Sequence, residues 1–215
     1  EQIRYIIKYQ ASIVRVTVAC LKKRVSELEK LGYKGQVLIK ITTEVPSMFS
    51  YNIETIKDKI NFLKKLGYTD DTVYYMTTTC PKLLSYSYDT IKLKYNLIKS
   101  YGYTDSEVIF ITSSYPALYG SSIENISDKL EYYNDVGLHF VALKTPKDLI
   151  QSADVTYARL EYFKSINFKI DVSNYKYLFW YESHFERRFG VAKNILLQRY
   201  SFEKYKEAKK NGTTI

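Results

Sequence analysis

The sequence predicts an all-α fold, a helical-repeat solenoid of about six units, each near 35 residues long. Four prolines recur at intervals of 35, 35 and 30 residues: Pro46, Pro81, Pro116 and Pro146. A second series recurs at 35, 35, 35 and 30 residues: Gly32, Gly67, Gly102, Gly137 and Asn167. A fixed period of this length is typical of repeat proteins. Stacked copies bury the apolar faces that one copy cannot bury alone.

Each unit is interpreted, in order, as a proline-led turn, a first helix, a glycine stop and a second helix. In one first helix the apolar residues are spaced by three or four: Ile53, Ile56, Ile60, Leu63 and Leu66. This spacing indicates an amphipathic helix. Gly and Asn tolerate the left-handed conformation that ends a helix. The segment "TDSE" (104–107) is a capping box that begins a second helix.

The phrase "CPKLLSYS" (80–87) lies where a second helix gives way to the next unit. Its proline disfavours continued helix, so we interpret the phrase as a turn whose two leucines fill the gap between helices. The hydroxyl runs before two prolines, "TTT" (77–79) and "TSS" (112–114), are interpreted as helix-end caps, with phosphate binding as the alternative.

The unit boundaries follow from the same counting. We place all units in a single domain (1–215), near 11–45, 46–80, 81–115, 116–145, 146–174 and 175–200, with a tail at 201–215. The unit at 116–145 has lost about a turn and a half of helix around "HFVALKT". The cluster "YKYLFWY" (175–181) is expected to pack as the C-terminal core, and the end "KEAKKNGTTI" to fray.

Charge and apolar content indicate which kinds of partner the protein is expected to have. Lys and Arg number 32 against 23 Asp and Glu, and most of the excess lies in residues 1–40 and 184–215. Basic ends favour a polyanionic partner. No apolar run reaches the roughly 18–20 residues that span a bilayer, so no membrane partner is expected. We expect an intracellular protein, cytoplasmic in a bacterium and organellar in a eukaryote.

No catalytic or metal site is expected. Cys20 and Cys80 lack zinc-ligand spacing and are predicted to be buried, reduced thiols. His139 and His184 stand apart from any carboxylate or cysteine at metal-ligand spacing. The sequence has no phosphate-binding glycine loop, nucleophile elbow or recurring acid pair. We therefore expect no cofactor and no enzymatic activity.

Two units carry a family resemblance: "PSMFSYNIETIKDKINFLKKLGYTD" and "PKLLSYSYDTIKLKYNLIKSYGYTD". Their order of proline, large apolar residues, "IKxK" and "LGYTD" resembles the repeat of the mitochondrial transcription termination factor (mTERF) family, over about residues 11–200. Periodicity alone leaves a right- or left-handed solenoid open, and the resemblance implies a left-handed superhelix. It further implies double-stranded nucleic acid held on a basic concave surface, and a role in organelle transcription, ribosome assembly or RNA processing.

One local match lies near the C-terminus. The segment "FERRF" (185–189) resembles the family's Leu-Glu-Lys-Arg-Ile and places Arg188 on its arginine. "GV" (190–191) stands where the family has Pro-Arg. The resemblance thus implies an altered or lost C-terminal functional segment.

A basic residue recurs thirteen residues after each proline or its equivalent. This position thirteen is occupied by Arg24, Lys59, Lys94, Lys129, Arg159 and Arg188. It lies at the edge of the apolar stripe, where the stem of a Lys or Arg can rest on apolar surface while its charge points outward. One interpretation is a row of phosphate contacts. The other is pairing between units, each cation meeting a carboxylate such as Glu54 or Asp89.

The candidate site is completed by basic residues at the two ends: Arg15, Lys22, Arg187, Lys193 and Arg199. The preferred hypothesis is a monomeric, non-catalytic nucleic-acid-binding protein that acts in transcription termination or regulation, with double-stranded DNA favoured over RNA. The alternative is a protein-interaction scaffold that uses the concave surface, because the chain has 23 tyrosines and tyrosine suits interfaces.

Overall fold

The structure is a computed structural model that describes residues 17–212, which form α- and 3₁₀-helices and no β-strand. The prediction of an all-α repeat fold is confirmed. Contacts divide the chain into two compact parts, with the boundary in the sequence between residues 121 and 122. We call them the N-terminal part and the C-terminal part. That all units share a single domain stays a prediction.

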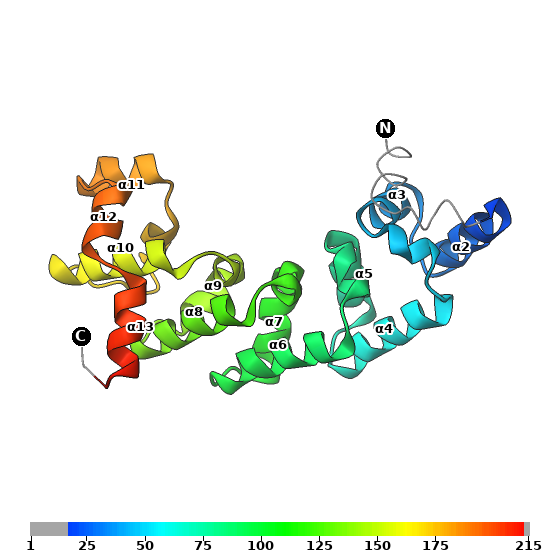
Figure 1. Ribbon diagram of the computed structural model, residues 1–215, viewed down its shortest axis with the longest axis horizontal. Coiled ribbons are helices and arrows are strands. Elements are labelled where there is room, and N and C mark those ends of the chain that lie inside the picture. The colour runs from blue at the N-terminus through cyan, green and yellow to red at the C-terminus, as the bar shows by residue number, and fades with distance from the viewer. Residues whose placement is uncertain (1–16, 213–215) are drawn as a thin grey trace. The chain divides into compact units, whose positions relative to one another are not determined.

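In the N-terminal part, pairs of α-helices alternate with short 3₁₀-helices, labelled η (Figure 1). Their bounds are α2 (Val18–Lys30), α3 (Gly35–Glu44), η2 (Pro46–Phe49), α4 (Ile53–Lys65), α5 (Asp70–Thr79), η3 (Pro81–Ser85), α6 (Tyr88–Ser100), α7 (Asp105–Ser114) and η4 (Pro116–Gly120). Each proline of the series begins a 3₁₀-helix. The helices α2, α4 and α6 are first helices, and α3, α5 and α7 are second helices.

The helix ends follow from local sequence. The Ser87 side chain accepts a hydrogen bond from the main-chain N–H of Thr90 and so caps α6. Thr104 and Glu107 form the predicted capping box of α7. Gly67 has φ of 103°, a conformation in which a side chain would be strained, and it allows the chain to leave α4. Asn167 has φ of 55° and ends a first helix of the C-terminal part as predicted.

The proline-led turns supply core residues. The residue two after the proline is fully buried in the three turns of the N-terminal part: Met48, Leu83 and Leu118. Leu84 is buried as well. The leucines of "CPKLLSYS" therefore fill the space between helices, as predicted.

Hydrogen bonds between tyrosine and threonine join successive repeats. The Tyr33 hydroxyl lies 2.9 Å from Thr77 Oγ1, and the Tyr68 hydroxyl lies 2.5 Å from Thr112 Oγ1. Each tyrosine follows a helix-ending glycine, and its threonine is found 44 residues later, in "TTT" or "TSS". Thr77 and Thr112 are buried, so these hydroxyls tie one repeat to the next.

The C-terminal part continues the pattern in modified form. Its elements are α8 (Ile123–Asp135), α9 (Phe140–Lys144), η5 (Pro146–Ile150), α10 (Ala153–Ser165), η6 (Tyr175–Phe179), α11 (Glu182–Phe189), α12 (Lys193–Arg199) and α13 (Phe202–Lys210). Helix α9 has five residues where α5 and α7 have ten, which confirms the predicted shortening around "HFVALKT". After α10, residues 168–174 form no helix.

The aromatic residues near the C-terminus pack together. The Phe163 ring centroid lies 5.0 Å from those of Phe168 and Phe189, and the Tyr177 centroid lies 4.5 Å from that of Trp180. The cluster 175–181 thus packs as core, as predicted, with Leu178 buried. Lys176 and Tyr181 are the exceptions, because both are exposed.

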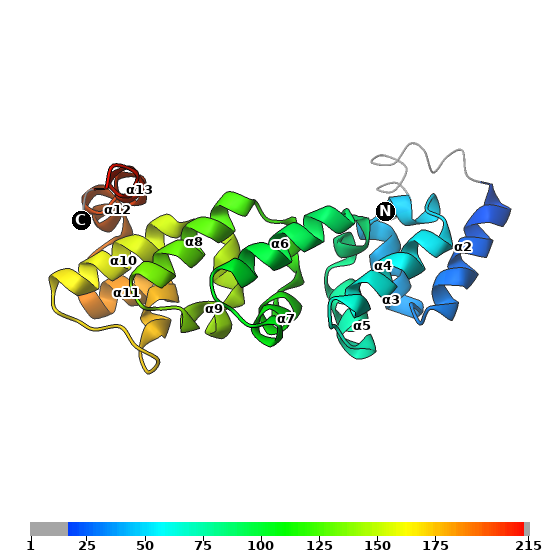
Figure 2. The same ribbon diagram turned by 90° about the horizontal axis from the view of Figure 1, so that it is seen from below.

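Helix α13 corrects the expectation of fraying for residues 206–210, whereas residues 213–215 of that segment lie outside the described residues. Residues 202–210 form a helix, and its Phe202 side chain is buried. Figures 1 and 2 show α8 and α10 side by side, with α13 running across them. The polar composition of this segment gives no sign of the surface that receives it.

The two thiols are free, but the predicted burial is wrong for Cys20, which is exposed in the first turn of α2. Cys80 is partly buried. Within residues 17–212, no helix combines the length and apolar character needed to cross a membrane.

Candidate nucleic-acid interface

The position-thirteen cations of α4 and α6 point into the protein. Lys59 and Lys94 are 5% and 6% exposed. The Lys59 ammonium donates to the main-chain carbonyl of Tyr86, and Lys94 Nζ donates to that of Tyr119 at 2.5 Å. Burial lowers the pKa of both lysines because it disfavours the charged form.

These carbonyls lie at or just after the end of the 3₁₀-helix of the following repeat. The last carbonyls of a helix have no partner within it. A cation from the preceding first helix therefore satisfies an acceptor that the turn leaves open, and it joins the two repeats. Lys59 also packs over the Tyr88 ring, with Nζ 3.7 Å from the centroid.

The C-terminal part repeats this arrangement. Lys129 Nζ donates to the Asp148 carbonyl at 2.8 Å and lies 2.6 Å from Asp148 Oδ1. Burial lowers the pKa of Lys129 although the Asp148 carboxylate acts in the opposite sense. Arg159 donates through one terminal nitrogen to the carbonyls of Leu178 and Trp180, each at 2.8 Å.

The remaining predicted residues have other surroundings. Arg24 pairs with Glu27 of its own helix at 2.7 Å. Lys193 pairs with Glu182 at 2.5 Å. The exposed members of the predicted site are Lys22, Arg187, Arg188 and Arg199. Arg15 lies outside the described residues.

The burial of Lys59, Lys94, Lys129 and Arg159 argues against phosphate contact by these four side chains. Of these four residues, only Lys129 pairs with a carboxylate of another repeat. The partner of Lys129 is Asp148, and not an acid in the first turn of a helix such as Glu54 or Asp89. The structure therefore assigns position thirteen mainly to main-chain carbonyls of the next turn, a partner that the sequence did not suggest.

A second position of the repeat is also basic, and its side chains are exposed to solvent. Of its residues, only Lys22 belongs to the site predicted from the sequence. Eleven residues after Pro46, Pro81 and the proline equivalent Ala11 stand Lys57, Lys92 and Lys22, and all three are exposed. In the three later units the same count reaches Ser127, Tyr157 and Glu186, so this basic position belongs to the N-terminal part. Two residues along an α-helix correspond to roughly 200° of rotation. Position eleven therefore faces solvent when position thirteen faces the core. The same repeat count would have found it in the sequence.

Further lysines enrich these first helices. Lys64 and Lys99 are exposed at equivalent positions and pair with Asp70 and Asp105 of the second helices, the latter at 2.8 Å. Helix α4 has four lysines against two acids, and α6 has three against one. Helices α5 and α7 have acids but no Lys or Arg. In α4 to α7, the basic residues thus lie in the first helices, and the charged residues of the second helices are all acidic.

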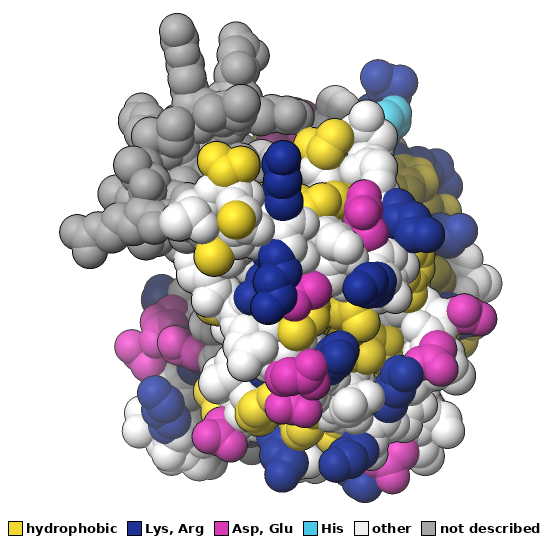
Figure 3. Space-filling view, turned by 90° about the vertical axis from the view of Figure 1, so that its right-hand side faces the viewer, with side chains coloured by type: hydrophobic (Ala, Val, Ile, Leu, Met, Phe, Trp, Pro, Cys, Tyr) yellow, Lys and Arg dark blue, Asp and Glu magenta, His cyan; other side chains and the backbone are white. Residues whose placement is uncertain are grey.

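The basic surface is interrupted by acids. Figure 3 shows Lys and Arg side chains over one end of the molecule with Asp and Glu between them. Glu54 lies 2.8 Å from Lys57, whereas Lys22 and Lys92 have no ion-pair partner among residues 17–212. Such a surface suits repeated contacts with a regularly charged backbone more than a single tightly bound anion.

In the segment "FERRFGV" (185–191), a glycine ends helix α11. Gly190 has φ of 71° and ends α11, with its N–H bonded to the Glu186 carbonyl at 2.8 Å. Arg187 and Arg188 lie in the last turn of α11, where positive charge suits the helix dipole. The glycine in "GV" thus serves as a helix stop.

Comparison with known proteins agrees with this description. The family model described as mTERF matches residues 1–171, about four-fifths of the chain. A search of curated proteins finds no match.

Proposed function

Because the chain belongs to the mTERF family, we propose that it is a non-catalytic protein that binds double-stranded DNA in preference to RNA and acts in transcription termination or regulation. The family consists of helical-repeat proteins that bind nucleic acid in gene expression. The observation that carries the proposal is the row of exposed lysines at position eleven.

The chemistry of this row fits a phosphate backbone. Lys22, Lys57 and Lys92 stand at one position of successive first helices and present exposed ammonium groups. Lysine binds phosphate as a point charge, and such contacts fix position without reading sequence. Each neutralised phosphate releases counterions, so affinity should fall steeply with salt.

The test is a fluorescence anisotropy titration with duplex DNA and with RNA of the same sequence, at several salt concentrations. The triple variant Lys22→Ala/Lys57→Ala/Lys92→Ala should bind DNA more weakly, and its log–log salt slope should be shallower by about three, since each phosphate contact contributes about 0.9. Tighter binding to RNA than to duplex DNA would refute the DNA preference.

A control variant that loses the same number of positive charges separates the effect of position eleven from the effect of net charge. Lys34, Lys82 and Lys144 are exposed and lie outside the first helices. Replacing these three by alanine should leave the salt slope nearly unchanged. Equal losses in the two triple variants would mean that net charge, and not position eleven, determines affinity.

A second candidate function, a protein-interaction scaffold, has one specific observation in its favour. Tyr75 and Phe110 occupy equivalent positions of α5 and α7, and about half of each side chain is exposed. Because these helices have no basic residue, this face disfavours phosphate and suits a protein surface. Tyr75→Ser/Phe110→Ser should leave DNA affinity unchanged; loss of DNA binding would place the nucleic acid on this face instead.

A further inference from the structure

Helix α8 differs from the basic first helices of the N-terminal part. Four acids lie along it at spacings of four, three and four residues: Glu124, Asp128, Glu131 and Asp135. Residues at such spacings share one face of an α-helix. The single basic residue of α8 is Lys129, which is buried. This acidic stripe would repel a phosphate backbone.

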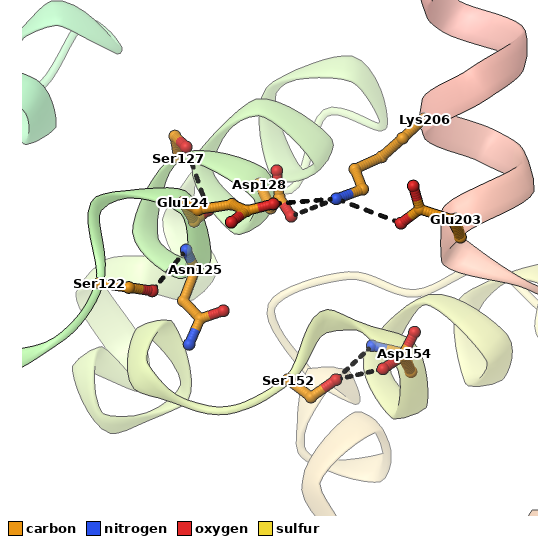
Figure 4. A network of polar contacts seen from close by, with 9 residues as sticks. All are labelled: Ser122, Glu124, Asn125, Ser127, Asp128, Ser152, Asp154, Glu203 and Lys206. Atoms are coloured by element: carbon orange, nitrogen blue, oxygen red, sulfur yellow. Dashed lines mark hydrogen bonds and ion pairs between the residues drawn. The ribbon is translucent and has the colours of Figure 1, made fainter.

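The lysines of α13 meet the acidic stripe in register. Lys206 Nζ lies 3.5 Å from Glu124 Oε1 and 3.1 Å from Asp128 Oδ2 (Figure 4). Lys209 Nζ lies 2.7 Å from Glu131 Oε1 and also contacts Asp135. Hydrogen bonding to Asp128 raises the pKa of Lys206. Each carboxylate of the stripe therefore has a lysine of α13 as its partner.

Aromatic rings form the apolar side of this contact. The Phe202 ring centroid lies 5.9 Å from that of Tyr132 in α8 and 5.5 Å from that of Tyr157 in α10. Tyr205 lies 5.2 Å and 5.4 Å from the same two rings, and its hydroxyl donates to Asp135. The surface of α8 and α10 thus combines an aromatic floor with an acidic wall, which we call the α8–α10 groove.

The contacts that hold α13 in the α8–α10 groove are weak enough for another helix to replace it. A nine-residue helix is too short to be stable alone, so α13 depends on the groove for its structure. Its ion pairs are partly exposed, and salt weakens such pairs. Among the side chains of α13, only that of Phe202 is buried.

We propose that the α8–α10 groove is a docking site for a lysine-rich amphipathic helix of a protein partner, and that α13 occupies the groove as a built-in competitor. The arrangement of α13 defines what fits: two aromatic residues three apart, each followed by a lysine four residues on. A partner helix with this pattern displaces α13 by satisfying the same four carboxylates. This proposal does not depend on the nucleic-acid function.

The test uses the α13 sequence itself as the probe. A fluorescent peptide of residues 201–212 is added to the full chain and its anisotropy is followed. Wild type should bind it weakly, because α13 fills the groove. Phe202→Ala/Tyr205→Ala removes the apolar anchors of α13 and leaves the groove intact, so this variant should bind the peptide at least tenfold more tightly.

Three controls make the result specific. A peptide with Lys206→Glu and Lys209→Glu should not bind the double variant. Adding Glu131→Lys/Asp135→Lys to that variant should abolish binding of the natural peptide. Lys204→Ala/Glu207→Ala changes two exposed residues of α13 that make no ion pair among residues 17–212, and this variant should behave as wild type.

The proposal is overturned if the peptide binds wild type and the double variant equally, or if it binds neither while circular dichroism shows intact helices. Should the aromatic variant fail to fold, Lys206→Ala/Lys209→Ala provides the second measurement, because these side chains lie at the surface of the contact. It weakens α13 through charge alone and is expected to bind the peptide more tightly than wild type by the same reasoning.

Discussion

Lys129 and Asp148 form a buried ion pair, with Nζ 2.6 Å from Oδ1 and both side chains at most 2% exposed. Asp148 is the second residue after Pro146, a place that Met48, Leu83 and Leu118 occupy in the preceding repeats. The Tyr133 hydroxyl donates to Asp148 Oδ2 and the Thr156 hydroxyl donates to Oδ1 at 3.4 Å. One repeat has thus replaced an apolar core residue with a charge that its neighbours satisfy.

Removing one partner of this pair should be costly. In Lys129→Ala the Asp148 carboxylate stays buried without its cation, and we expect a loss of about 3–5 kcal/mol in the free energy of unfolding. Lys129→Met/Asp148→Leu restores the apolar character of the other repeats and should lose much less. Urea unfolding followed by circular dichroism measures both, and a double variant as unstable as the single one would contradict this account.

Buried position-thirteen lysines should not contribute to nucleic-acid affinity. Lys59→Met and Lys94→Met keep the apolar stem and remove an ammonium that bonds only inside the protein. We expect DNA affinity and its salt slope to equal those of wild type. Anisotropy titration of the double variant beside Lys57→Ala/Lys92→Ala checks this. If the methionine variant lost as much affinity as the alanine variant, position thirteen would have to reach the phosphates.

The hydrogen bonds of Tyr68 should contribute measurably to the stability of the N-terminal part. Tyr68→Phe removes a hydroxyl that bonds Thr112 Oγ1 at 2.5 Å and the Tyr119 hydroxyl at 2.6 Å. Since the Tyr119 hydroxyl is left buried, we expect a loss of about 1–3 kcal/mol in the free energy of unfolding. Tyr75→Phe, at an exposed tyrosine, is the matched control and should change little. Equal effects of the two would argue against the buried network.

Two helix-ending glycines provide a matched pair. A Cβ at Gly67 would lie 2.8 Å from Ile109 Cδ1, at φ of 103°, whereas a Cβ at Gly137 has no atom within 4 Å, at φ of 70°. Gly137→Ala should cost about 1–2 kcal/mol for the left-handed conformation alone. Gly67→Ala should cost more because Ile109 must also move. Thermal unfolding by circular dichroism ranks the two variants, and the reverse order would show that packing around Gly67 is looser than described.

Alkaline pH should destabilise the fold. Burial raises the pKa of Tyr119, Tyr132 and Tyr133 above the ordinary value of 10.0. A raised folded-state pKa leaves stability intact below pH 10 and reduces it above, because the unfolded chain ionises first. The buried lysines act oppositely, since their lowered pKa values make stability rise toward pH 10.5. The pKa values of Tyr33, Tyr68, Tyr95 and Tyr103 are raised by burial in the same way, whereas the lysines with a lowered pKa are Lys59, Lys94 and Lys129. The tyrosines are therefore the larger group, so the urea midpoint should fall between about pH 10 and 11.5; a constant midpoint would contradict this.

The elements could be predicted because their signals are local. Proline ends a second helix through its own ring, and Gly67 leaves a first helix through its own φ, so neither depends on distant residues. The capping box at Thr104 and the shortened helix α9 are likewise confirmed. Counting from the prolines therefore placed the helices and the turns.

The candidate site could be predicted only in part. Periodicity showed that position thirteen is always basic, but a residue at the edge of an apolar stripe can turn inward or outward. Lys94 turns inward because the Tyr119 carbonyl of the next repeat is within reach. The outward direction of position eleven follows from rotation about the helix, so the exposure of Lys57 and Lys92 could have been predicted from the sequence. The docking of α13 could not be predicted from the sequence, since its partners on α8 lie more than 70 residues away in the chain.

By itself, the sequence determined the repeat, its length, the order of helix and turn, and the family, because each depends on residues close together in the chain or on a regular count. The tertiary structure alone decided which cations are buried. It showed that Lys129 pairs with an aspartate in a core position, and that the basic end of the chain lies on the acidic stripe of α8. The physical reason is that a charged side chain takes the partner that the surrounding helices bring within hydrogen-bond distance, and that distance is set by packing between repeats.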